Sequence, residues 1–289
     1  MRCLFELGAD PMSYKLEPRT GSCRKGPGDL SIEVVKLLVE FGYDVKSTGH
    51  LILEDFVDSQ ESLDWLLDQG VDINRTRNDA TLALTGGKRG YGSYNLRQRQ
   101  YSVVVLNYVA ARGDIRLFDH LVSRGADPQR SLALHYATRC LETEKSVAMI
   151  DHLLDHYGMD IHADNEKMRD RSNSADDSGK PLNSAVVAGN LPAIRRLLER
   201  GARPDYTAVA CAIECAYFKD LPAGLNALLK AGADAGDALE QAAQKENVDA
   251  VRIRLAYGAD RDRSLQQNRA YFENKARDLV PNDHSEGVL

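Results

Sequence analysis

The most chemically distinctive stretch of this sequence runs from Arg75 to Tyr101. It holds six basic residues and a single acid in a chain whose formal net charge is −6. Arginine and tyrosine are the residue types that anchor interfaces, and the interspersed glycines let a loop adapt to its ligand. We therefore predict a recognition segment for an acidic or phosphorylated partner, the alternative being a solvated surface loop. The predicted contact residues of this segment are Arg89, Tyr91, Tyr94, Arg97, Arg99 and Tyr101.

Other residues with reactive side chains form weaker patterns. His152 and His156 have the spacing of a zinc-binding pair, but no glutamate follows the first histidine as the H-E-x-x-H motif requires. We interpret them as outward-facing residues of a helix. The chain contains no G-x-S-x-G motif and no dinucleotide-binding fingerprint, and the glycines before Lys88 lack the spacing of a phosphate-binding loop. The sequence thus predicts no catalytic residue, no metal site and no cofactor.

The composition sets limits on the class of protein and on its partners. With 43% hydrophobic and 28% charged residues, the chain has the composition of an ordinary globular protein. The acidic balance disfavours nucleic acid and anionic membranes as partners. No apolar run is long enough to cross a bilayer, and Glu6 comes too early for a signal peptide. The five scattered cysteines indicate free thiols. We expect an intracellular protein, cytoplasmic or nuclear.

The elements that would position these residues are short helix pairs that recur along the chain. In the clearest pair, Pro181 suits the first position of a helix and Gly189 suits its end. A second helix carries the apolar residues Leu197 and Leu198 and stops at Gly201. Neither helix is long enough to bury its apolar face alone. Each pair therefore needs a similar pair on either side.

A Gly-x-Asp closure marks equivalent positions through the whole sequence, with arginine replacing aspartate in one case. An apolar pair usually stands three and four residues before the glycine, as Leu66 and Leu67 do before Gly70. Successive closures lie about 36 residues apart on average, which indicates one structural repeat per closure. The closing glycines are Gly8, Gly42, Gly70, Gly125, Gly158, Gly201, Gly232 and Gly258.

These motifs resemble those of ankyrin repeats. The segment 180–185 (KPLNSA) resembles the T-P-L-H-x-A that opens such a repeat, and 197–202 (LLERGA) resembles the L-L-x-x-G-A that closes one. The segment 134–137 (LHYA) keeps the histidine of the family. The resemblance implies an all-α ankyrin-repeat solenoid of about seven to eight helix-turn-helix repeats with a C-terminal capping helix.

The resemblance also gives an expected domain organisation. We expect one ankyrin-repeat domain over residues 1–280, interrupted by insertions at 75–101 and 161–180 and followed by a flexible tail at 281–289. In repeat proteins such insertions map to loops, commonly on the binding side. Because Met1 falls inside the second helix of a repeat, an alternative is that the chain belongs to a longer array or larger assembly. The oligomeric state stays open.

For function, the resemblance implies non-enzymatic binding of another protein by a concave face made of hairpin tips and first helices. His135 would be the structural histidine that bonds to the backbone between repeats. An alternative is an enzyme on the same scaffold, with a small molecule in the concave groove and His135 or Glu214 as acid or base. The predicted partner contacts on the first helices, all expected to be exposed, are Asn107, Tyr108, Tyr136 and Asn183.

Overall fold

In the computed structural model of the chain, the described residues are 2, 6–13, 30–75, 103–164, 179–214, 221–234 and 248–258. These residues form α-helices and short 3₁₀ turns and contain no β-strand. The predicted all-helical class is therefore confirmed for this part of the chain. The predicted contact residues of the first insertion lie outside the described residues, as do the expected capping helix and tail: they are Arg89, Tyr91, Tyr94, Arg97, Arg99, Tyr101 and 267–289.

The helices in the N-terminal half are short, and several are single 3₁₀ turns. They are η1 (Pro11–Ser13), α2 (Ile32–Glu40), α3 (Val45–Thr48), η2 (Gly49–Leu51), η3 (Leu53–Phe56), α4 (Gln60–Asp68), α6 (Val104–Arg112), α7 (Ile115–Ser123) and η5 (Pro128–Arg130). The later helices are α8 (Ala133–Ala137), α9 (Thr143–Asp155), α10 (Pro181–Val187), α11 (Leu191–Glu199), α12 (Tyr206–Glu214), α13 (Leu221–Lys230) and α15 (Val248–Ala256).

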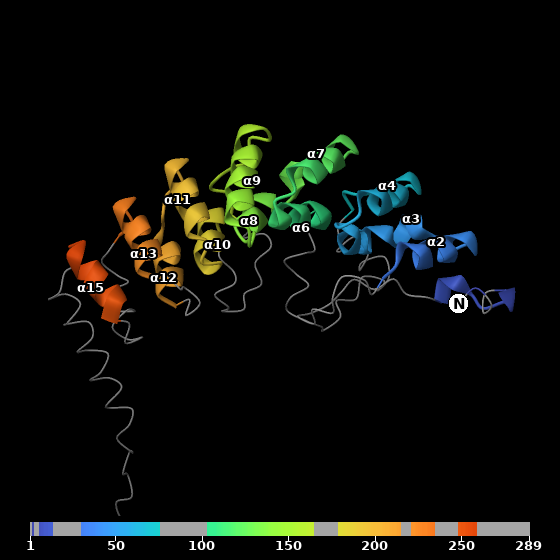
Figure 1. Cartoon of the computed structure of the whole chain (residues 1–289), viewed down its shortest axis with the longest axis horizontal. Coiled ribbons are helices and arrows are strands. Elements are labelled where there is room, and N and C mark those ends of the chain that lie inside the picture. Colours follow the sequence, from blue (N-terminus) through green and yellow to red (C-terminus); the bar gives the residue numbers. More distant parts are fainter. Residues whose placement is uncertain are drawn as a thin grey trace, which may run out of the picture.

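From α6 onward, consecutive helices pack as pairs: α6 with α7, α8 with α9, α10 with α11, and α12 with α13. The first helices of neighbouring pairs also touch, because α8 contacts α6 and α10, and α10 contacts α12. Among the second helices, α11 contacts both α9 and α13. Figure 1 shows these pairs following one another in a row, with α7, α9, α11 and α13 along one edge and α6, α8, α10 and α12 along the other.

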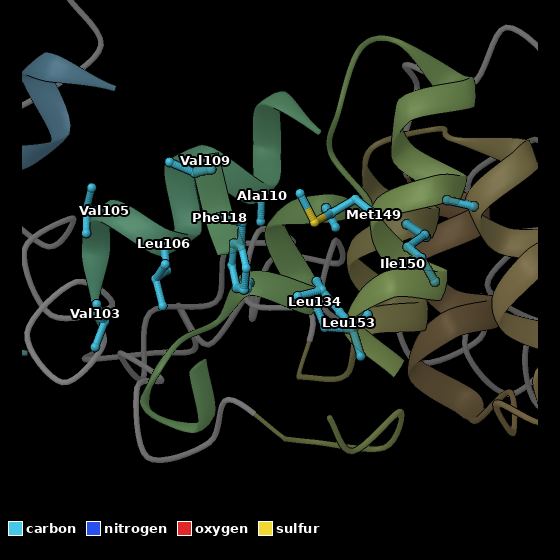
Figure 2. Close-up of a cluster of buried hydrophobic side chains, with 14 of the residues drawn as sticks. Val103, Val105, Leu106, Val109, Ala110, Phe118, Leu134, Met149, Ile150 and Leu153 are labelled. Atoms are coloured by element: carbon cyan, nitrogen blue, oxygen red, sulfur yellow. The ribbon is translucent and has the colours of Figure 1, made fainter. Parts of the chain in front are cut away.

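The core runs between the pairs, and Figure 2 shows the part shared by α6, α7, α8 and α9. Leu106 of α6, Phe118 of α7, Leu134 of α8 and Leu153 of α9 are fully or almost fully buried there. Burying such a side chain is worth about 1.5–3 kcal/mol relative to leaving it exposed. Each pair therefore depends on its neighbour for much of its stability.

The predicted limits of the clearest repeat are confirmed. Helix α10 starts at Pro181, and α11 is capped by Asn190, whose side chain accepts a hydrogen bond from the backbone N–H of Ala193 at 3.2 Å. Gly201 follows α11 with a φ of 93°. A Cβ at this glycine would meet nothing within 4 Å, so glycine is favoured by the left-handed backbone and not by lack of space.

The remaining closing glycines have the same left-handed conformation, with φ values from 58° at Gly158 to 99° at Gly125. The left-handed turn that follows α11 therefore recurs at these glycines. The region before α4 differs from the others. The segment 51–56 matches the pattern of a first helix only weakly, and it forms no continuous helix: Leu51 ends η2, Ile52 lies between the two turns, and η3 covers Leu53–Phe56. Ile52 and Phe56 are nevertheless buried in the core.

Candidate interaction surface

The residue that follows the leucine of α6, α8 and α10 is buried. Asn107 and Asn183 are each only 2% exposed, so the expectation that they face a partner as exposed residues is wrong. The Oδ1 of Asn107 accepts a hydrogen bond from the backbone N–H of Leu132 at 2.7 Å, and the Nδ2 of Asn183 donates to the Oδ1 of Asp205 at 3.5 Å. Both side chains therefore connect one first helix to the segment that leads into the next.

His135 occupies the same position in the repeat between them. Its side chain is 5% exposed, and its Nε2 lies 2.9 Å from the carbonyl oxygen of Gly179, just before α10. Burial lowers the pKa of His135 to about 4, against the opposing effect of the hydrogen bond to Gly179. The imidazole is therefore neutral at pH 7, with Nε2 carrying the proton that it donates. This geometry confirms the expected backbone contact between repeats.

The same geometry argues against acid or base catalysis by His135. A general acid or base must reach its substrate directly or through a water molecule. In His135 the ring is enclosed, and the protonated nitrogen is already bonded to Gly179. Glu214, the other residue suggested for this role, ends α12, and its side chain lies outside the described part. The perturbed pKa of His135 thus follows from its structural position.

Tyr108 and Tyr136 follow Asn107 and His135 directly and present a different surface. Both are half-buried and pack against the core. Their ring centroids lie 6.1 Å apart with an interplanar angle of 52°, and the guanidinium of Arg139 lies 6.0 Å from the ring centroid of Tyr136. The two tyrosines therefore form a rigid aromatic pair whose remaining surface is accessible, so they stay candidates for partner contact.

The second helices are joined by a series of ion pairs that the sequence analysis missed. Asp64 of α4 lies 2.7 Å from the Nε2 of His120 and 2.5 Å from the Nη1 of Arg124, both on the α7 side. Burial alone would raise the pKa of Asp64, but His120 and Arg124 outweigh it and hold that pKa below its ordinary value. The sequence contains a sign of this pattern, because the dipeptide Asp-His recurs at 119–120 and at 151–152, in successive second helices.

The series continues along the row and changes the interpretation of His152. The Nε2 of His152 lies 2.6 Å from Asp119 of α7, so this histidine faces the neighbouring helix. The prediction that it faces solvent is wrong. Asp151 on the same helix bonds the Nε of Arg196 at 2.7 Å and the Nη1 of Arg200 at 2.9 Å. These contacts act between repeats, as the Asn107 and His135 contacts do on the first helices.

A cleft of about 480 Å³ opens across three successive tips. Each tip is a segment that directly follows a Gly-x-Asp closure, here those of Gly42, Gly70 and Gly125. The tips were predicted to belong to the binding face, but the cleft itself was not foreseen. Its lining residues are Lys46, Ser47, Gly70, Asp72, Asn74, Arg75 and Arg130.

Hydrogen bonds hold the three tips together. The Nη1 of Arg75 donates to the carbonyl oxygen of Ser47 at 2.9 Å, which links the second tip to the first. The amide of Asn74 donates to the carbonyl oxygen of Gly125 at 2.7 Å and accepts from the backbone N–H of Asp127 at 2.8 Å, which links the second tip to the third. The cleft is therefore a built feature of the array, with Asn74 as its central brace.

Comparison with known proteins adds no family assignment: no protein-family model matches the chain, and no curated protein matches it significantly. Within the described ranges, no helix combines the length and apolar character needed to cross a membrane. In that same part of the chain, no group of three or more histidine, cysteine, aspartate or glutamate residues is placed to hold a metal ion.

Proposed function

We propose that this chain is a degenerate ankyrin-repeat solenoid that binds another protein, without catalysis, through its tips and first helices. Three features support the ankyrin assignment: the paired helices in a row, the left-handed closing glycines, and the Asn107 and His135 contacts at one repeat position. The observation that carries the binding function is that consecutive repeats bring equivalent segments together. Three tips form one cleft, and two first helices form one tyrosine pair.

The proposed partner is an intracellular protein with an acidic or phosphorylated segment. Tyr108 and Tyr136 would supply rigid apolar area, as tyrosines do at interface centres. The basic insertion adjoins the cleft in the chain, because Arg75 lines the cleft and the backbone N–H of Val103 donates to the carbonyl oxygen of Arg130 at 2.9 Å. We propose that its residues extend the contact: Arg89, Tyr91, Tyr94, Arg97, Arg99 and Tyr101.

The test starts from affinity capture with the full chain in an extract of its native cells, followed by purification of the retained protein. Binding is then measured for the wild type and for the double variant Tyr108→Ala, Tyr136→Ala. Loss of two interface tyrosines is expected to weaken binding at least tenfold, since such residues contribute about 1–2 kcal/mol or more each. Circular dichroism checks that the helices remain folded.

Tyr257→Ala is the matched control, because Tyr257 lies just after α15, is 37% exposed and is remote from the proposed face. It should bind the partner as the wild type does. Equal affinity of the double variant and the wild type would contradict the proposed face. Turnover of a small molecule by the purified chain would instead support the enzyme hypothesis.

A further inference from the structure

The lining of the cleft across the three tips holds more positively than negatively charged residues. Lys46, Arg75 and Arg130 each come from a different tip, whereas Asp72 is the single carboxylate in the lining. None of the three cations forms an ion pair with a described residue. The cleft therefore presents three positive charges around one opening, in a chain whose overall charge is −6.

Two of these cations contact a neighbouring tip before any ligand binds, and Arg75 is also oriented by a hydrogen bond. The side chain of Lys46 passes over Gly70: a Cβ added at Gly70 would lie 3.5 Å from the Cδ of Lys46, which is an ordinary van der Waals distance. The guanidinium of Arg75 is oriented by its bond to Ser47. Its other donors make no hydrogen bond within the described residues. Such preorganisation lowers the entropic cost of binding.

The acids of the three tips accept hydrogen bonds within their own turns. Asp44 accepts hydrogen bonds from the N–H and hydroxyl of Ser47, and the side-chain hydrogen bond lowers the pKa of Asp44. Asp127 accepts a hydrogen bond from the backbone N–H of Gln129 at 3.0 Å. Asp72 likewise accepts from the backbone N–H of Asn74 at 2.9 Å. These carboxylates keep their charge, but within the described residues none forms an ion pair with Lys46, Arg75 or Arg130, so the three cations remain available to an anion.

We propose that this cleft binds the phosphoryl group of a phosphorylated serine or threonine in an extended segment of the partner. A carboxylate carries one charge and is satisfied by one bidentate arginine. A phosphoryl group has nearly two charges and three acceptor oxygens, which match cations from several directions. Arginine clusters recognise phosphorylated motifs in this way. The cleft lies on successive tips, along which an extended peptide can continue to the neighbouring repeats.

This inference rests on the proposed binding function but concerns a separate group of residues, so it is tested without the native partner. The probe is the pentapeptide Gly-Ala-pSer-Ala-Gly, titrated into the ¹⁵N-labelled full chain while the Nε–Hε signals of arginine are followed by NMR. Binding in the millimolar range or tighter is expected, with shifts at Arg75 and Arg130 that weaken as NaCl rises. The same peptide with serine should bind at least tenfold more weakly, and the peptide with glutamate should fall between them.

Variants locate the site. Arg75→Gln and Arg130→Gln should each weaken phosphopeptide binding at least tenfold. Arg116→Gln removes the same charge from an exposed position on α7 and should bind as the wild type does. Equal loss in Arg116→Gln would show a general charge effect and overturn the site. Inorganic phosphate that binds as tightly as the phosphopeptide, or a serine peptide that binds equally well, would also overturn the proposal.

The outcome can be separated from that of the proposed function. If Arg75→Gln leaves phosphopeptide binding intact while the Tyr108 and Tyr136 double variant loses the captured partner, only the phosphoryl site is wrong. If the reverse holds, the cleft binds phosphopeptides and the tyrosine face is wrong.

Discussion

The side chain of His135 joins two repeats and at the same time makes the stability of the fold depend on pH. Its Nε2 donates to the carbonyl oxygen of Gly179, across a separation of 44 residues in sequence. Only the neutral ring suits this enclosed position, because burying the imidazolium would remove its hydration. Asn107 forms an equivalent contact one repeat earlier without a titratable group. The pH dependence of this position thus belongs to His135 alone among the three equivalent residues.

A prediction at this scale concerns the stability of the fold in mild acid. The pKa of His135 is about 4 in the folded chain against 6.5 for a free histidine, so the unfolded chain takes up the proton first as the pH falls. The stabilisation is complete above pH 6.5 and declines to its minimum near pH 4, a loss of about 3 kcal/mol. His135→Asn should remove this contribution to the pH dependence of the free energy of unfolding, which is measured by urea unfolding at several pH values between 7 and 4.

Carboxylates with lowered pKa values, such as Asp64 and Asp205, also lose stabilisation as the pH falls, so the relevant quantity is the difference between variant and wild type. His162→Gln is the control, because the ring of this histidine makes no hydrogen bond or ion pair within the described residues, and the variant should show the wild-type dependence of stability on pH. The same pH slope in His135→Asn and in the wild type would show that the ring is accessible to protons in the folded state.

At the scale of the helices, the limits of individual elements could be predicted well from the sequence. Pro181 and Gly189 bound α10, and Gly201 follows α11, because proline, asparagine and glycine act through local backbone geometry that needs no knowledge of the fold. The short turns before α4 were predicted less well. There Ile52 and Phe56 are buried in the core without a regular helix, so the spacing of apolar residues predicts the local structure less well.

Contacts between elements could not be predicted in the same way. Asparagine after the leucine of a first helix was expected to be exposed on the binding face. Its burial at Asn107 depends on a backbone N–H 25 residues later that needs a partner. The orientation of His152 depends on Asp119 of another helix. The cleft needs three tips to meet in space. Each of these features depends on how neighbouring repeats align with one another, which the sequence of a single repeat does not specify.

The closing glycines give a prediction for a single element. Gly201→Ala should destabilise the fold by about 1–2 kcal/mol, because a left-handed backbone crowds a Cβ against its own carbonyl group. Urea unfolding should show a lower midpoint and an unchanged slope. Gly201→Asn is the informative comparison, since asparagine tolerates this conformation better and should cost less. Equal losses in both variants would mean that contacts with neighbours, and not the backbone, determine the residue at this position.

On the scale of the whole molecule, the described helices from α6 onward form a row in which each pair contacts mainly its two neighbours. The stability of such an array is approximately the sum of repeat and interface terms. The ion pairs from Asp64 to Arg200 lie at successive interfaces between second helices. A change at one interface should therefore have a local effect, and binding at the tips need not depend on distant repeats.

Asp151 offers a direct test of this local behaviour. Its carboxylate is shared by Arg196 and Arg200 across the α9–α11 interface, and its side chain is 27% exposed. Asp151→Asn should cost about 1 kcal/mol at low salt and less in 1 M NaCl, because exposed pairs are weak and screened. Hydrogen exchange should accelerate in α9 and α11 but not in α4. Asp249→Asn removes a carboxylate that faces Arg252 within α15 at 3.6 Å, so it should leave α9 and α11 unchanged. Uniformly faster exchange along the whole row in Asp151→Asn would show instead that the repeats open as one cooperative unit.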